Sequence, residues 1–126
     1  MFSDMLGADV VAEYLAREEV PYVVGLPGHA ISSTLDAIGR RGLKILQAKS
    51  EEGACHLADG FFRASGRPLV VFTTAGAGAT NTVLGVATAY VDSSSLILLT
   101  GDVSTYFYGY GTFQLSLIHI SAPTRQ

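Results

Sequence analysis

Residues 49–63 read KSEEGACHLADGFFR and place a carboxylate at the start of an amphipathic stretch. Small or apolar residues recur at a spacing that predicts one buried helix face, made of Ala54, Leu57, Ala58, Phe61 and Phe62. Glu51 lies on that face, one turn before Ala54. Because a charge is rarely buried without a partner, two interpretations stay open. Glu51 is either an acid favoured by the positive end of the helix or an acid with a chemical function.

Apolar runs and amphipathic stretches alternate along the rest of the chain. The runs predict strands at 20–25, 43–47, 68–74 and 95–101, and the stretches predict helices at 8–19, 31–40, from 51 onward and at 79–92. This alternation indicates an α/β fold with a mostly parallel sheet and helices on both faces. Ligands bind such sheets at the carboxyl ends of the strands. Four segments fall there: 25–29, 50–51, 74–78 and 101–102.

The composition limits the classes of function. The chain has 126 residues, of which 48% are hydrophobic and 15% charged, and this suits one modest core. A net charge of −3 without a basic cluster argues against nucleic acid as a partner. We expect no membrane span and no signal peptide, and therefore a cytoplasmic location. The single cysteine, Cys55, has no disulfide or metal partner and is expected to be an inert core thiol.

The stretch at 49–63 resembles a known family motif. It is similar to R-H-E-x-G-A-x-x-x-A-x-G-Y-A-R in the pyrimidine-binding (PYR) domain of thiamine diphosphate enzymes, namely those of the acetolactate synthase, pyruvate oxidase and benzoylformate decarboxylase type. Aligned on Gly53 and Ala54, Glu51 rather than Glu52 takes the place of the family's glutamate. The Arg-His pair that precedes it in the family is Lys-Ser in this chain.

A second stretch, residues 73–81, reads TTAGAGATN and resembles T-S-G-P-G-A-T-N, with Ala77 in place of proline. The resemblance implies that Thr74, Gly78 and Asn81 lie near the cofactor or at a domain contact. Two other interpretations stay open. The G-x-G could begin a dinucleotide fingerprint, although Asn81 stands where its third glycine belongs, or it could be a plain turn.

The loop at 25–29, GLPGH, resembles the family's G-x-P-G-x loop. Pro27 and Gly28 are therefore expected at the cofactor. His29 occupies a position that faces the substrate in the family, where a histidine could relay a proton near neutral pH. An exposed loop histidine is the alternative. Gln114 corresponds to a family glutamine near the reacting carbon.

The end of the chain has a different character. Residues 115–126 read LSLIHISAPTRQ and resemble the translation of a transposase adapter used in sequencing libraries, LSLIHISEPTR. We expect residues 1–114 to be a PYR domain of the three-layer sandwich type, incomplete at its C-terminus, and residues 115–126 to be a non-native tail. The alternative is a genuine terminal strand.

The resemblance implies an activity. The parent enzyme would be a thiamine diphosphate-dependent decarboxylase or carboligase of 2-oxo acids or aldehydes. Glu51 would hydrogen-bond the cofactor's aminopyrimidine, and no metal ligand is expected in this chain. The resemblance assigns Mg²⁺ and the diphosphate to another domain, in a second subunit of a homodimer or homotetramer, and FAD is a possible further cofactor. This chain alone would be inactive. Alternatives are a free-standing PYR subunit of a split decarboxylase and a non-catalytic nucleotide-binding α/β module.

Overall fold

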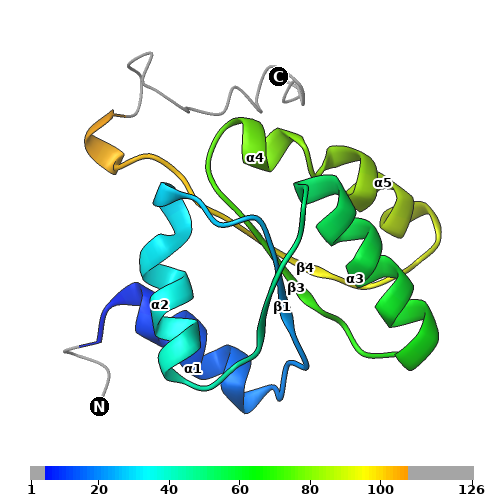
Figure 1. Cartoon of the computed structure of the whole chain (residues 1–126), viewed down its shortest axis with the longest axis horizontal. Helices are drawn as coiled ribbons and strands as arrows, with labels where there is room; N and C mark the ends of the chain where they lie inside the picture. Colours follow the sequence, from blue (N-terminus) through cyan, green and yellow to red (C-terminus); the bar gives the residue numbers. More distant parts are fainter. Residues whose placement is uncertain (1–4, 108–126) are drawn as a thin grey trace, which may run out of the picture.

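A computed structural model describes residues 5–107, which form a four-stranded parallel sheet between two layers of helices (Figure 1). The strands are β1 (Val23–Gly25), β2 (Ile45–Gln47), β3 (Val70–Thr73) and β4 (Ile97–Thr100), in the spatial order β2-β1-β3-β4. The helices are α1 (Gly7–Arg17), α2 (Ser32–Arg40), α3 (Glu51–Ser65), α4 (Ala77–Thr80) and α5 (Val83–Val91), with short 3₁₀ turns η1 (His29–Ile31) and η2 (Thr105–Phe107). The predicted three-layer α/β fold is confirmed.

The central strands β1 and β3 have a core on each face. Val23 and Phe72 pack with α1 and α2, whereas Val24 and Val71 pack with α3. This division follows from the two-residue period of a strand, which sends neighbouring side chains to opposite faces. Every residue of β3 is buried, as expected for a strand that helices cover on both sides.

The predicted helix at 79–92 is wrong in one respect, because the chain forms two helices there. The Thr82 hydroxyl donates to the Ala79 carbonyl at 2.6 Å, and the Thr82 amide donates to the same oxygen at 3.2 Å. These bonds span three residues rather than four, so they tighten the turn and interrupt the α-helical ladder. The strands are each shorter than predicted. At β1, Pro21 lacks the N–H that a ladder needs.

The buried face of α3 also differs from the prediction. Leu57 is 43% exposed, whereas the buried residues are Glu51, Ala54, Cys55, Ala58 and Asp59. These five follow the 3.6-residue period more closely than the predicted set, because Leu57 lies well off the line through Ala54 and Ala58. The position of Glu51 on the buried face is confirmed.

The order of the strands creates a switch point between β1 and β3. The chain continues from β1 to the neighbour on one side, β2, and from β3 to the neighbour on the other side, β4. The loops that leave β1 and β3 therefore diverge at the carboxyl end of the sheet, where a crevice opens in such folds.

Among the described helices, none is long and apolar enough to cross a membrane.

Candidate functional site

Glu51 is the first residue of α3 and lies at this switch point. Its side chain is 7% exposed. The preceding residue, Ser50, caps the helix, because its Oγ accepts a hydrogen bond from the Gly53 amide at 3.1 Å. The free N–H groups of the first turn also favour a carboxylate at this place. The sequence thus positions an acid that is both buried and electrostatically supported.

Asn81 is the described hydrogen-bond partner of this acid. Its Nδ2 donates to Glu51 Oε2 at 3.2 Å, across 30 residues of sequence. Asn81 lies directly after α4, in the break between α4 and α5. The interruption at Thr82 therefore places the amide beside the carboxylate, and a neutral donor leaves the charge of Glu51 unneutralised.

Gly78 makes room for the other carboxylate oxygen. A Cβ atom on Gly78 would lie 3.4 Å from Glu51 Oε1, 2.8 Å from Thr74 Cγ2 and 3.0 Å from Thr73 Oγ1. A side chain at this position would crowd Thr74 and Thr73 and would touch Glu51. Gly78 therefore allows the start of α4 to pack closely on Thr73 and Thr74 beside the Glu51 carboxylate.

Gly28 joins the loop after β1 to the loop after β3. A Cβ atom on Gly28 would lie 2.5 Å from Thr74 Cβ and 2.6 Å from Thr74 Oγ1. The turn after β3 uses Gly76 with a φ of 63°, a conformation that favours glycine. Gly28, Thr74, Gly78, Asn81 and Glu51 thus form a connected group, as the sequence predicts.

Thr74 brings an unused polar atom to this group. Its Oγ1 is buried and has no hydrogen-bond partner among the described residues. Such atoms are uncommon in folded proteins, and each calls for an explanation such as a ligand. A hydroxyl can both donate and accept, so Thr74 could bind a polar group that enters the crevice.

The remaining predicted residues lie at the margin or beyond. Pro27 and His29 are exposed. His29 begins η1, and its carbonyl accepts a bond from the Ser32 hydroxyl at 2.8 Å. Gln114 and the tail at 115–126 lie outside the described residues. Within residues 5–107, no cluster of three or more His, Cys, Asp or Glu side chains could hold a metal ion.

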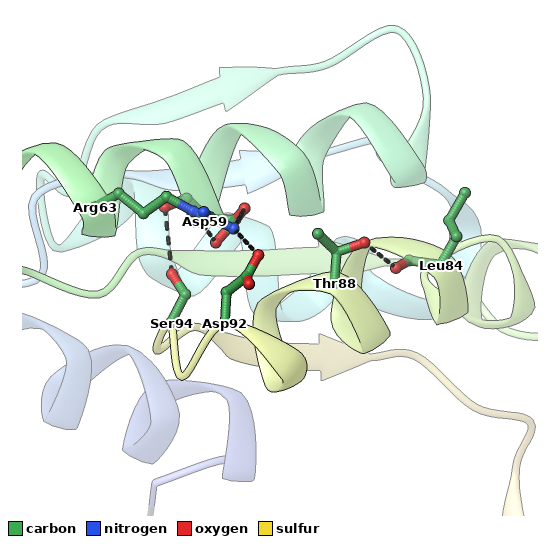
Figure 2. A network of polar contacts seen from close by, with 6 residues as sticks. All are labelled: Asp59, Arg63, Leu84, Thr88, Asp92 and Ser94. Carbon is green, nitrogen blue, oxygen red and sulfur yellow. Dashed lines mark hydrogen bonds and ion pairs between the residues drawn. The ribbon is translucent and has the colours of Figure 1, made fainter.

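The sequence analysis missed a second buried acid, Asp59. Arg63 donates to both of its carboxylate oxygens, at 3.0 and 2.9 Å, and also to Asp92 at the end of α5 (Figure 2). The Ser94 hydroxyl donates to the Asp59 carbonyl at 3.3 Å. The hydrogen bonds from Arg63 hold the pKa of Asp59 below its ordinary value. The spacing of Asp59 and Arg63, one helical turn apart, was the available signal.

Cys55 and His56 have structural positions. Cys55 is buried, as predicted for a core thiol, and burial raises the pKa of its thiol to about 11; the inertness of this thiol stays a prediction. The Nε2 atom of the exposed His56 lies 3.7 Å from Glu52 Oε1 on the outer side of α3, away from the group around Glu51.

Comparisons with known proteins identify the family of this chain. The family model described as "Thiamine pyrophosphate enzyme, N-terminal TPP binding domain" matches residues 5–121. Over 119 residues the chain is 41% identical to the acetolactate synthase isozyme 3 large subunit of Escherichia coli strain K12. Over 110 residues it is 44% identical to the probable acetolactate synthase large subunit of Methanocaldococcus jannaschii. The mitochondrial acetolactate synthase catalytic subunit of Saccharomyces cerevisiae is 40% identical over 114 residues.

The alignments cover most of this chain and a small part of each relative. They include 93%, 87% and 90% of this chain, but 21%, 19% and 17% of the three relatives. The chain therefore spans about a fifth of the length of these proteins. With a match over residues 5–121 and a parallel α/β sheet, the chain belongs to the thiamine pyrophosphate (thiamine diphosphate) enzyme family and corresponds to its N-terminal TPP-binding domain.

Proposed function

We propose that Glu51 activates the aminopyrimidine of thiamine diphosphate in an acetolactate synthase-like enzyme, through a hydrogen bond that its carboxylate accepts from a ring N–H. The burial of this carboxylate at the switch point carries the proposal. Its described partner is a neutral amide, so the charge stays available to a ligand. A buried acid without a countercharge lowers the stability of a domain, and such groups are concentrated at functional sites.

The residues around Glu51 fit an aminopyrimidine. Thr74 Oγ1 offers a hydrogen bond that the described part of the chain leaves unused. Gly78 places no side chain beside Glu51 Oε1, and Gly28 packs against Thr74. Pro27 and Gly28 would contact the cofactor from the loop after β1. Asn81 would hold the carboxylate in one orientation. When bound, thiamine diphosphate would supply a nucleophilic carbon and an electron sink for the decarboxylation of a 2-oxo acid.

His29 and Gln114 would act on the substrate side. His29 is exposed on the loop after β1, and an imidazole there could hydrogen-bond the carboxylate of a 2-oxo acid or an aldehyde oxygen. Gln114 would approach the reacting carbon.

The outer surface of α5 supports an assembly with a second subunit. Val83, Leu84, Tyr90 and Val91 are all exposed, and a helix that is apolar all round is normally covered. Since the chain spans about a fifth of its relatives, we propose that a diphosphate-binding domain of a partner subunit completes the site with Mg²⁺. FAD would be a further cofactor in some parents. The isolated chain would be inactive, and the parent a cytoplasmic homodimer or homotetramer.

The test is a chimera in which this domain replaces the aligned segment of the Escherichia coli isozyme 3 large subunit. We expect Glu51→Gln to lower hydrogen exchange at the thiazolium carbon and acetolactate formation by about 100-fold or more, as for loss of a general acid or base. The matched control is Glu52→Gln, which removes an exposed carboxylate one residue away and should leave both rates unchanged. Exchange at the normal rate in the Glu51 variant would refute the role.

The nucleotide-binding alternative is tested by titration of the chain with NAD. We expect no binding, because Asn81 stands in place of the fingerprint's third glycine and its amide is engaged by Glu51. Saturable binding would favour that alternative.

A further inference from the structure

Helices α3 and α5 approach each other closely where Gly85 meets Cys55. A Cβ atom on Gly85 would lie only 2.3 Å from Cys55 Cβ and 3.4 Å from the Glu52 carbonyl oxygen. Both residues are buried. No side chain fits at position 85 unless α5 moves away from α3, because the obstacle is a carbon attached directly to the backbone.

This contact lies one helical turn from the hydrogen bond between Asn81 and Glu51. On α3, Cys55 follows Glu51 by four residues, and Gly85 follows Asn81 by the same interval. The 3.2 Å bond between Asn81 and Glu51 and the contact between Gly85 and Cys55 are therefore neighbouring points along one interface. Because only residues 82–84 separate Asn81 from Gly85, we expect a shift of α5 at Gly85 to displace Asn81 as well.

The far end of the same interface is held in another way. There Arg63 of α3 bonds to Asp92, directly after α5 (Figure 2). An exposed arginine side chain can follow small movements, so this bond does not set the spacing near Glu51. The spacing is set by the rigid contact at Gly85.

We propose that Gly85 is a positioning residue: its contact with Cys55 sets the distance at which the Asn81 amide reaches Glu51. A contribution of Gly85 to catalysis rests on the proposed role of Glu51. The effect of Gly85 on the distance between Asn81 and Glu51 does not depend on that role. Gly85 touches neither cofactor nor substrate in this proposal and acts only through Asn81.

The experiment follows the Asn81 side-chain amide by NMR in the ¹⁵N-labelled 126-residue chain, without cofactor. We expect Gly85→Ala to speed its exchange with solvent by about tenfold, the factor that one hydrogen bond is worth. The rate should approach that in Glu51→Ala, which lacks the acceptor. The control is Gly60→Ala on α3, where a Cβ atom would meet nothing within 4 Å, and it should behave as wild type.

A pair of second-site variants identifies the responsible atom. Cys55→Gly removes the Cβ that the new methyl group would meet, whereas Cys55→Ala removes the sulfur and keeps that Cβ. In the double variant with Gly85→Ala, Cys55→Gly should restore slow exchange of the Asn81 amide. The double variant with Cys55→Ala should keep the fast exchange.

Each result decides the question. Slow exchange in a folded Gly85→Ala variant of reduced stability would mean that Gly85 serves packing alone, and the proposal would be overturned. If Gly85→Ala does not fold, the Cys55→Gly double variant decides: a folded protein with slow exchange supports the proposal, and any other behaviour overturns it. Since no cofactor is present, failure here is separate from failure of the proposed function, which the chimera measures.

Discussion

Two carboxylates lie buried on the same face of α3, two turns apart, and their surroundings are opposite. Glu51 is 7% exposed and Asp59 is 6% exposed. Asp59 receives two hydrogen bonds from the Arg63 guanidinium, whereas the described partner of Glu51 is the neutral amide of Asn81. Burial alone therefore does not identify a functional acid. The informative property is whether the chain neutralises the charge that it buries.

The two ends of α3 are also held by different physical means. Around Asp59 the helices are joined by ion pairs and hydrogen bonds, as Figure 2 shows. Around Glu51 the contacts are close ones at glycines: Gly85 of α5 against Cys55 of α3, and Gly28 against Thr74 between the loops after β1 and β3. The first kind of joint weakens when its charges are removed, and the second when volume is added.

The largest effect on stability is expected from Arg63→Met at the charged end. This change keeps most of the aliphatic stem and leaves Asp59 buried without its cation, which is the costly way to break such a pair. We expect Tm to fall clearly and by more than for Arg17→Met. That control removes a cation from an exposed pair with Glu13 at the same helical spacing. An equal fall in Tm in the two variants would show that leaving Asp59 buried without its cation carries no extra cost.

Gly28→Ala should have the next largest effect, at the end where glycines make the joint. The new methyl group would overlap Thr74, and such overpacking costs about 1–3 kcal/mol. Urea unfolding measures the loss. It should be the same in low and high salt, because no charge is involved, whereas the loss in Arg63→Met should shrink as salt screens the pair. Gly39→Ala, where a Cβ atom would meet nothing within 4 Å, is the control. A salt-dependent loss in Gly28→Ala would contradict this division.

Acid should lower the free energy of unfolding through Asp59, by less than the two substitutions above. Because Arg63 holds the pKa of Asp59 below its ordinary value, the pair adds stability above the pKa of an unfolded aspartate, about 3.9. This stability is lost as pH falls through the lower pKa of the folded state. Urea unfolding between about pH 6 and pH 2.5 should therefore show a steeper loss for wild type than for Asp59→Asn. Parallel curves would mean that Asp59 is not coupled to folding.

The smallest effect concerns the Cys55 thiol, which lies beneath Gly85. Its pKa is raised to about 11 by burial, so the folded state favours the neutral thiol, and its contribution to stability is lost as pH rises from the ordinary value of 9.0 toward about 11. At pH 8, near the upper physiological range, a disulfide reagent should modify the native chain far more slowly than the urea-unfolded chain. Equal rates would show that the thiol is accessible and that α5 does not cover it.

Much of the fold was predictable because its signals are local. The four apolar runs and the helical stretches between them indicate a parallel α/β sheet, and the helical spacing around Ala54 places Glu51 on a buried face. The resemblance of three motifs to a family added thiamine diphosphate as the expected ligand. Where the local signal was ambiguous, the boundaries were wrong. The helix after Gly78 breaks at Thr82 because one hydroxyl competes for a backbone carbonyl.

The sequence alone determined that this chain alternates strands with helices and that Glu51 begins a helix at the carboxyl end of a strand. Only the tertiary structure decided the long-range partners, namely Asn81 for Glu51 and Asp92 for the Arg63 that already pairs with Asp59 one helical turn away. The physical reason is that periodicity is a property of neighbouring residues. Contacts across about 30 residues depend instead on how closely two helices pack, and at Gly85 the packing of α5 against α3 leaves no room for a side chain.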